Sequence, residues 1–403
     1  MLDFDLNEYC YGCGACVNSC PHNAIQLIHD NDGCYIPKID ETACIHCGKC
    51  ERVCIHLHHV DINESLAEQG CFAAFQTDIE KRKKSASGGM FYPLACDVIR
   101  QGGYVCGCVW NEEMVAVHIV TNRVEDVARM CNSKYVQSNI GRCFEEVREH
   151  LKQGRLVLFS GTPCQCAACK ASVGNPNNLI ALAIICEGVP SPKVWQKYRE
   201  SREKAYGSKI TEVNFRCKEP IGWSLPYYTV KTDSGISYHE ISYHENSFVL
   251  GLLQGLTYRN SCYHCAYKGN NGCADIVIGD LWKVDYNLLK RSCNKGISAL
   301  LLNTEKGRIA FEKVAEQYFL ENYPLENVQR NNPPLTRSGE KNVNRDCFFE
   351  KLDLMPIEEN LNINIKRKKW KIALNKILIY MGIYKTLRDL NHIIRDYRNR
   401  VNK

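Results

Sequence analysis

The chain has 403 residues, of which 45% are hydrophobic and 24% are charged, a length and composition that allow several globular domains and exclude a disordered or fibrous protein. Nine of its 25 cysteines lie within residues 1–54. A disulfide-rich secreted protein would be short and exported, but the first ten residues are acidic and contain no apolar run. We therefore expect the thiols to face the reducing cytoplasm, where a high density of cysteine indicates metal or redox chemistry.

The net charge of +6 is unevenly distributed. Residues 366–403 contain twelve Lys and Arg and two Asp, a net charge of +10, whereas residues 1–365 have a net charge of −4. The main part of the chain therefore lacks the positive charge of a nucleic-acid-binding protein, and we expect no nucleic-acid partner. No uninterrupted apolar stretch reaches the roughly 18 residues of a membrane-spanning helix.

Two cysteine repeats open the chain and predict a ferredoxin-type domain in residues 1–60. Three cysteines spaced by two residues can bind one 4Fe–4S cluster, and the fourth cysteine of each repeat ligates the other cluster. The predicted ligands of the first cluster are Cys10, Cys13, Cys16 and Cys54. Those of the second cluster are Cys20, Cys44, Cys47 and Cys50. A zinc site would need only two Cys-x-x-Cys pairs and would leave the doubled triplet unexplained.

Other candidate ligands in this region have simpler interpretations. Cys34 lies between the repeats and reads as a small buried hydrophobic residue, with cluster ligation as the alternative. His56, His58 and His59 read as surface polar residues, since the cysteines already supply eight thiolates. Residues 61–69 are polar and predict a linker or a short helix.

The long middle segment alternates strand and helix patterns, which predicts an α/β domain over residues 70–335. Strands are predicted at 104–110, 115–120, 155–160, 179–186, 275–279 and 297–303, with a hairpin at 227–232 and 236–241. Helices are predicted at 89–101, 124–131, 143–152, 192–206 and 305–318. After a break at Asn331-Asn332-Pro333-Pro334, residues 345–403 form a basic helical tail. The fold class is thus a multidomain α+β protein.

Six motifs in the middle segment carry a family resemblance. They are 84–89 (KSASGG), 133–138 (SKYVQS), 160–165 (SGTPCQ), 186–192 (CEGVPSP), 214–223 (NFRCKEPIGW) and 274–282 (ADIVIGDLW). Together they resemble the beta subunit family of coenzyme F420 hydrogenases and dehydrogenases. The resemblance implies FAD, an iron–sulfur cluster, and electron transfer between one-electron carriers and a two-electron acceptor such as F420 or a chlorophyll derivative. Many bacterial relatives are associated with surface-polysaccharide functions, and their substrate is unclear.

A third cluster is predicted from strand ends and from the family motifs together. Cys164 begins a helix after one buried strand, and Cys186 ends the next. Cys262 and Cys265 form a Cys-x-x-Cys loop. Because parallel strands end at one edge of their sheet, these four thiols can meet there. The alternatives are four unrelated buried cysteines, or Cys273 as a rival ligand. Two further cysteines, Cys166 and Cys169, are expected in the core.

The resemblance also supplies candidates for FAD binding. Ser87, Gly88 and Gly89 precede a helix and offer backbone donors to a diphosphate. Lys134, Arg216 and Lys218 are candidate cations for phosphate or for the reduced flavin ring, with ordinary surface charge as the alternative. The complete candidate set is Ser87, Gly88, Gly89, Lys134, Thr162, Arg216 and Lys218. No Walker or dinucleotide fingerprint is present, which disfavours a Rossmann nicotinamide site.

The sequence therefore predicts a cytoplasmic iron–sulfur flavoprotein oxidoreductase with a ferredoxin-like or other electron-carrier partner and an unknown small-molecule substrate. The alternative is a non-catalytic electron-transfer subunit of a larger complex. F420 has an acidic tail, and the negative body gives it no support beyond the resemblance. For the basic tail, packing on the body, docking of a partner, and binding at an anionic membrane surface all remain open.

Overall fold

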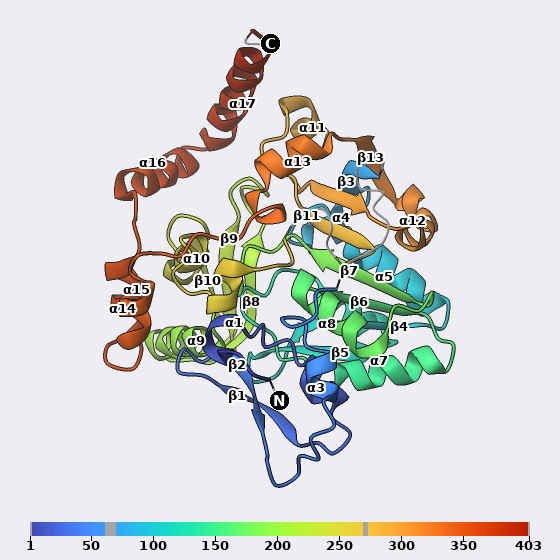
Figure 1. The fold of residues 1–403 in the computed structure, drawn as a ribbon. Coiled ribbons are helices and arrows are strands. Elements are labelled where there is room, and N and C mark those ends of the chain that lie inside the picture. Colours follow the sequence, from blue (N-terminus) through green and yellow to red (C-terminus); the bar gives the residue numbers. More distant parts are fainter. Residues whose placement is uncertain (1, 61–69, 269–272, 402–403) are drawn as a thin grey trace.

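A computed structural model describes residues 2–60, 70–268 and 273–401, and Figure 1 shows their arrangement. The predicted linker at 61–69 lies outside the described residues. The first 60 residues form a ferredoxin-like unit around one antiparallel hairpin. Its elements are α1 (Leu6–Tyr9), α2 (Ala15–Ser19), β1 (Ile25–His29), β2 (Tyr35–Ile39) and α3 (Lys49–Arg52).

The middle of the chain is built on an eight-stranded mixed sheet in the order β13-β3-β12-β11-β7-β6-β4-β5. Strands β4, β6, β7 and β11 are parallel, so their carboxyl ends share one edge. The bounds are β3 (Cys71–Gln76), β4 (Tyr104–Trp110), β5 (Ala116–Thr121), β6 (Val157–Gly161), β7 (Leu179–Ile184), β11 (Ile276–Asp280), β12 (Ser298–Leu302) and β13 (Tyr318–Asn322). The central strands are almost continuously apolar because helices cover both faces of the sheet.

Two helical layers enclose this sheet. One face packs against α7 (Cys143–Lys152) and α8 (Pro163–Val173). The other packs against α5 (Phe91–Arg100), α6 (Val124–Met130) and α12 (Glu305–Glu312). Shorter helices at the rim of the sheet are α4 (Ile79–Lys83), α11 (Tyr286–Arg291) and α13 (Leu325–Asn331). The middle of the chain is thus a three-layer α/β domain, as predicted.

A smaller antiparallel sheet, in the order β10-β9-β8, has its own aromatic core. Its strands are β8 (Ile210–Cys217), β9 (Tyr227–Thr232) and β10 (Ser237–Ile241). The helices packed around this core are α9 (Pro192–Tyr206), α10 (Ser247–Leu253), α14 (Arg345–Glu350) and α15 (Ile357–Asn364). The chain then ends in α16 (Lys369–Tyr380) and α17 (Tyr384–Val401). Ile379 and Tyr384 of these helices pack against the cluster of Ile221, Leu225 and Ile241, and α17 reaches the top of Figure 1.

Two sequence predictions need correction. The predicted helix at 305–318 ends at Glu312, and a short 3₁₀ turn, η2 (Ala315–Gln317), leads into the edge strand β13. The partner of β13 is β3, which the sequence analysis missed. Residues 318–322 are extended because they pair with β3. The helical pattern of the preceding residues therefore predicted a helix that is longer than the one observed.

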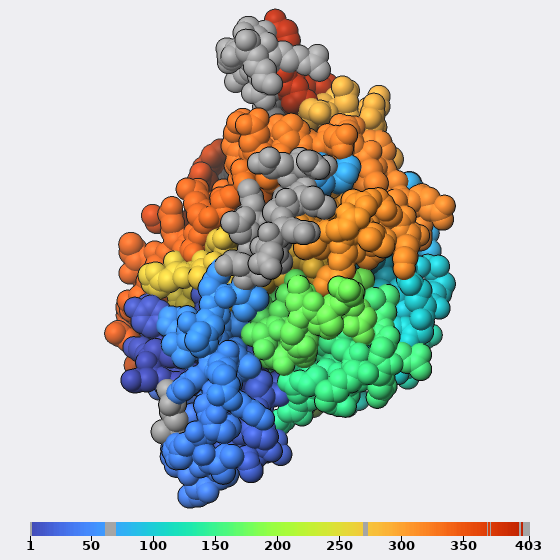
Figure 2. All heavy atoms as spheres, turned by 45° about the vertical axis from the view of Figure 1, so that its right-hand side comes forward, coloured from blue at the N-terminus to red at the C-terminus, as the bar shows by residue number. Residues whose placement is uncertain are grey.

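The ferredoxin-like unit is not separate from the body. Tyr11, Ala15 and Ile55 are buried in the same core as the central sheet. The side chain of Asn18 donates to the carbonyl of Gly141 at 2.9 Å and accepts from the backbone N–H of Phe144 at 3.1 Å. Asn18 therefore caps the start of α7 across the boundary, and Figure 2 shows the N-terminal residues in blue packed directly against the green segments.

Candidate functional site

The four cysteines predicted to bind the first cluster line one pocket, formed by Cys10, Cys13, Cys16 and Cys54. Cys10 and Cys13 lie on the loop between α1 and α2, and Cys16 lies in the first turn of α2. Gly12 and Gly14 in this loop have φ values of 58° and 75°. Such positive φ angles let the loop turn tightly enough for the three sulfurs to face inward. Chain topology therefore brings together residues from both repeats, as the crossed ligand set requires.

The second predicted set lines another pocket, formed by Cys20, Cys44, Cys47 and Cys50. Gly48, with a φ of 69°, makes the corresponding turn between the second and third cysteine of the triplet. The Cys47 side chain is exposed, and the neighbouring Ile45 is 58% exposed. This pocket is therefore the one of the two that lies near the protein surface.

The third predicted set also converges, at the carboxyl edge of the large sheet. Cys164 lies in the first turn of α8 and Cys186 follows β7, while Cys262 and Cys265 come from η1 (Asn260–His264) and its end. Burial, together with the charges of Cys262 and Cys164 and against that of Lys268, raises the pKa of the Cys186 thiol to about 12. The charges of Cys164 and Cys262 act on both Cys186 and Cys265, so these two thiols link the other members of the set.

The rival cysteines have other roles. The Cys273 thiol donates to the carbonyl oxygen of Pro163 at 3.1 Å. Cys166 and Cys169 are fully buried in the core, as predicted. Cys34 is buried as well. Among the described residues, no three His, Cys, Asp or Glu side chains come close enough to hold a single metal ion. The thiolates of a 4Fe–4S cube bind different irons and so need a wider spacing.

Burial dominates the chemistry of the third set. It raises the pKa of the Cys164 thiol, although the Thr162 hydroxyl and the charges of Arg259 and Lys268 act in the opposite direction. The position of Cys164 at the start of α8 therefore does not by itself produce a thiolate. The positive charge of bound iron would be needed to keep the sulfur deprotonated. The donor set, four thiols beside two cations, fits an anionic cluster.

The first and third sets adjoin each other. The charges of Cys13 and Cys164 act directly on one another, and Tyr11 lies within reach of Cys164, Cys262 and Cys265. The Tyr11 ring also packs edge-on against Tyr267, with ring centroids 5.6 Å apart. The ferredoxin-like unit therefore presents its first pocket, rather than its second, to the cysteines of the sheet edge.

The predicted diphosphate loop lies at the same carboxyl edge, but several of its groups have partners within the protein. The Gly88 N–H donates to Ser298 Oγ at 3.0 Å, and the Ser87 hydroxyl donates to the Ile297 carbonyl at 2.8 Å. A Cβ on Gly88 would lie 2.5 Å from the carbonyl oxygen of Ala74, so close backbone packing already requires glycine. Gly89 has a φ of 82°.

Three of the other candidates also make internal contacts. Lys218 donates to the carbonyl oxygens of Arg82, Ser87 and Lys295, and so fixes the loop. Lys134 donates to four carbonyls at the end of α6, from Arg129 to Asn132, with distances of 2.7–3.3 Å. Thr162 caps α8 and contacts Cys164 Sγ at 3.1 Å. Their participation in FAD binding stays a prediction.

Arg216 belongs to an aromatic cluster at this edge. It makes a two-pronged ion pair with Asp280, at 2.7 and 3.0 Å, and lies over the ring of Trp282 at 5.2 Å. Trp223 stacks on Trp282 with centroids 5.0 Å apart and donates to the same Asp280 carboxylate at 2.6 Å. The buried Nε of Arg216 has no hydrogen-bond partner among the described residues. Such a planar, partly unsatisfied surface suits a flat aromatic cofactor.

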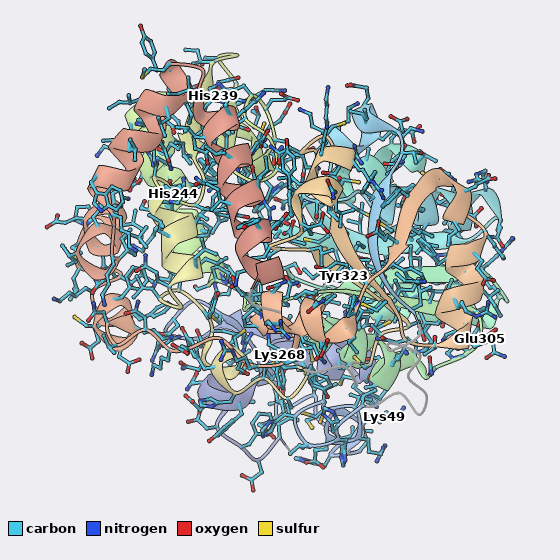
Figure 3. All side chains as sticks on the ribbon, turned by 90° about the horizontal axis from the view of Figure 1, so that it is seen from above. Lys49, His239, His244, Lys268, Glu305 and Tyr323 are labelled. Atoms are coloured by element: carbon cyan, nitrogen blue, oxygen red, sulfur yellow. The ribbon has the colours of Figure 1, made fainter. Side chains whose placement is uncertain are left out.

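Sequence reasoning missed three cations at the site. Arg82, buried beside the predicted loop, has Nε and one NH₂ group without hydrogen-bond partners among the described residues. The basic run at residues 81–84, directly before the loop at 85–89, could have pointed to Arg82. Arg259 lies three residues before Cys262, and the Lys268 side chain, labelled in Figure 3, contacts the carbonyl of Cys186. Both flank the Cys-x-x-Cys motif, which would have pointed to them.

A cavity of about 690 Å³ lies at the opposite edge of the sheet, between α5 and α12. Asp275 lies there, at the start of β11, where its carboxylate contacts the ammonium of Lys170 at 3.3 Å. Asp275 therefore lies at the amino edge of the sheet, whereas Asp280 lies at the carboxyl edge. Since the three cysteine sets and the Arg216 cluster are remote from this cavity, its size does not mark the redox site.

The organisation of these sites defines an iron–sulfur protein of the oxidoreductase, electron-transfer type. Residues 154–328 match the family described as the carboxyl terminus of the coenzyme F420 hydrogenase/dehydrogenase beta subunit. Residues 9–56 match the family described as "4Fe-4S dicluster domain". The chain thus carries the C-terminal domain of the F420 hydrogenase/dehydrogenase beta subunit family behind a two-cluster domain, and the predicted resemblance is confirmed.

Among solved structures, the chain is similar to a chain of the xenon-derivatised F420-reducing [NiFe] hydrogenase complex from Methanosarcina barkeri. The two are 17% identical, the match covers 75% of this chain and 92% of that chain, and the TM-score is 0.45. No curated protein sequence matches this chain.

Proposed function

We propose that this protein is an iron–sulfur flavoprotein oxidoreductase that transfers electrons between a one-electron carrier protein and a two-electron acceptor, through three 4Fe–4S clusters and FAD. The observation that carries the proposal is the sequence of neighbouring cysteine sets, from the exposed pocket around Cys47 to the buried set around Cys164. An electron carrier can approach the exposed end around Cys47. The buried end opens toward the sheet edge that bears the Arg216 cluster.

The proposed ligands of each cluster follow these pockets. The first cluster takes Cys10, Cys13, Cys16 and Cys54, the second Cys20, Cys44, Cys47 and Cys50, and the third Cys164, Cys186, Cys262 and Cys265. Each cluster exchanges one electron at a time, and FAD would supply the two-electron chemistry that the clusters lack.

For FAD, we place the isoalloxazine ring against the cluster of Arg216, Trp223 and Trp282, and the diphosphate near the loop at 85–89. The N–H groups of Arg82 and Arg216 that lack partners support this placement, because a buried N–H group without an acceptor is costly unless a ligand supplies one. Lys218 would act indirectly here, by holding the loop carbonyls in place.

The experiment that tests the proposal is anaerobic purification of the full chain, with iron, sulfide and flavin counted per chain. We expect about twelve irons, about twelve sulfides and one FAD. A chain with iron but no flavin, isolated only with a second protein, would favour the alternative of an electron-transfer subunit without its own substrate pocket. A zinc-containing protein would contradict both.

All 25 cysteines are unpaired, which supports a reducing compartment, and we propose the cytoplasm. Among the described helices, none is long and apolar enough to cross a membrane. We further propose that α16 binds an anionic membrane surface, since Trp370 is 69% and Ile377 54% exposed within a strongly basic tail. Association with surface-polysaccharide synthesis rests on the resemblance alone, and altered polysaccharide in a deletion strain would test it.

A further inference from the structure

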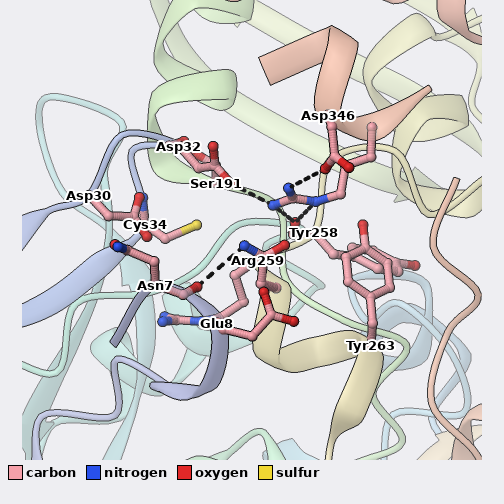
Figure 4. A network of polar contacts seen from close by, with 12 residues as sticks. Asn7, Glu8, Asp30, Asp32, Cys34, Ser191, Tyr258, Arg259, Tyr263 and Asp346 are labelled. Carbon is pink, nitrogen blue, oxygen red and sulfur yellow. Dashed lines mark hydrogen bonds and ion pairs between the residues drawn. The ribbon is translucent and has the colours of Figure 1, made fainter. Parts of the chain in front are cut away.

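Arg259 connects the ferredoxin-like unit to the third cysteine set. Its guanidinium group donates to the carbonyl oxygens of Cys10 and Tyr35, the latter at 3.2 Å, and its Nε donates to Ser261 Oγ at 3.0 Å. The residue is only 2% exposed. It is the residue before η1 and precedes Cys262 by three residues, so one buried cation contacts the loop of the first set and belongs to the loop of the third. Figure 4 shows Arg259 in a polar network with Asp30, Cys34 and Tyr263 nearby.

The first loop is shaped to admit this guanidinium group. A Cβ on Gly12 would lie 2.3 Å from Arg259 NH1 and 2.3 Å from the carbonyl oxygen of Tyr35. Only glycine therefore allows the turn at 10–13 to close over the arginine. The close approach of Arg259 to this loop therefore depends on the glycine of the Cys-x-Gly-Cys sequence.

Arg259 forms no salt bridge with a carboxylate among the residues that the structure describes. The charge of Asp30 does act on it, but the Asp30 carboxylate accepts from the backbone N–H of Cys34 at 2.8 Å. A neighbouring arginine, Arg345, is equally buried and pairs with Asp32 at 2.7 Å. Burying an unpaired charge is strongly unfavourable, so Arg259 requires an anion that the protein side chains in contact with it do not supply.

The anions that fit are the two iron–sulfur sites themselves. The Arg259 guanidinium group donates to the carbonyl of Cys10 in the first set, and the Arg259 carbonyl accepts from the backbone N–H of Cys262 in the third set at 3.1 Å. A cube bound by four thiolates has a net negative charge, and its reduction adds one electron and hence one more negative charge. A fixed cation beside it favours the reduced state.

We propose that Arg259 is a positioning residue shared by the first and third clusters, whose charge raises the reduction potential of both above that of the second cluster. This inference rests on the proposed third cluster. Electrons that enter at the exposed second cluster would then move inward to two clusters of matched, higher potential, with the cation common to both.

The test uses the full-length chain, purified anaerobically, with a potentiometric titration of the clusters followed by electron paramagnetic resonance. In Arg259→Gln we expect two of the three potentials to fall by at least about 59 mV, a tenfold change in the ratio of reduced to oxidised cluster. The second cluster is the internal control. Arg259→Lys should restore most of the shift, and Arg345→Gln, which removes an equally buried arginine, should leave all three potentials unchanged.

The outcomes separate this inference from the function on which it rests. A wild-type chain with only about eight irons would remove the third cluster, and the shared role with it. About twelve irons with unchanged potentials in Arg259→Gln would overturn the role of Arg259 alone. If Arg259→Gln does not retain its iron, Arg259→Lys decides: near-wild-type potentials support the role of charge, and a fall of tenfold or more in two ratios contradicts it.

Discussion

The hydroxyl oxygen of Tyr11 accepts a hydrogen bond from the backbone N–H of Ala266 at 3.1 Å. Tyr11 lies between two cysteines of the first set, and Ala266 directly follows Cys265 of the third. This single bond thus joins the ferredoxin-like unit to the family domain at the point where the two cysteine sets meet. The relative position of the two sets is therefore fixed by direct contacts, which is what electron transfer between them requires.

Crossed ligation of the first two clusters can be tested by single substitutions. Cys54→Ser should abolish the same spectroscopic signal as Cys10→Ser, because both residues line one pocket. Cys20→Ser should abolish the other signal. Each variant should lose about four irons per chain, measured in the full-length protein. Cys34→Ala is the control and should retain all iron; loss of the same signal in Cys20→Ser and Cys54→Ser would contradict the pairing.

The third cluster makes a separate prediction. Cys262→Ser should lose about four of about twelve irons and leave the first two cluster signals in place. Cys273→Ala is a matched control, since this thiol lies next to the same helix start and donates to Pro163. Retention of all iron in Cys262→Ser together with its loss in Cys273→Ala would reverse the ligand assignment.

Binding of FAD should depend on Arg82 more than on the glycine loop. We expect Arg82→Gln to weaken FAD binding at least tenfold, about 1.4 kcal/mol, by removing the unpartnered donors beside the loop. Lys81→Gln, on the exposed side of the same helix, is the control. Both are measured by equilibrium dialysis of the deflavinated chain with its iron content checked. Equal affinity in the two variants would exclude Arg82. A Gly88 substitution is uninformative, because it also disrupts backbone packing.

Stability should fall in weak acid because of His118. Burial lowers the pKa of this imidazole from 6.5 to about 4. His118 is therefore protonated below about pH 6.5 in the unfolded chain, but only below about pH 4 in the folded chain. Its contribution to stability is therefore full above pH 6.5 and decreases as the pH falls. Between pH 7.5 and 5.5 the loss is about 1.4 kcal/mol.

His118→Gln should remove this part of the acid sensitivity. The comparison is the decrease in thermal midpoint between pH 7.5 and 5.5, measured for the wild type and the variant in the same buffers. The wild type should show the larger decrease. An equal decrease in both proteins would show that other groups control acid sensitivity in this range.

Membrane binding by the tail can be tested with a shortened chain. A chain ending at Lys368 keeps α15, whose Leu361 is completely buried, and lacks α16 and α17. We expect the full chain, but not the shortened one, to sediment with vesicles containing phosphatidylserine, and added salt to weaken the binding. Equal sedimentation of both chains, or binding only to neutral vesicles, would contradict an electrostatic membrane contact.

The sequence predicted the parts of this protein that local patterns specify. The cysteine spacing predicted which residues gather around the first two pockets, and helices α7 and α9 begin and end at the residues predicted from the helical patterns. Strand β3 was missed because its conformation is set by pairing with β12 and β13, residues more than 200 positions away.

The candidate FAD residues show the same limit. Lys134 and Lys218 are cations in family motifs, but only the three-dimensional structure shows that backbone carbonyls surround both ammonium groups. Conversely, Arg82 and Arg259 stand out because they are buried without carboxylate partners among the described residues, and burial cannot be read from a single sequence.

The contact between Asn18 and the start of α7 has a consequence for how the protein is made. Asn18 is synthesised 126 residues before Phe144, whose N–H it binds. At about 5–20 residues per second, the ribosome needs about 6 to 25 seconds to cover that distance. During this interval the nascent N-terminal segment, with its nine cysteines, cannot yet pack against α7. Cluster insertion therefore competes with oxidation and misfolding during translation.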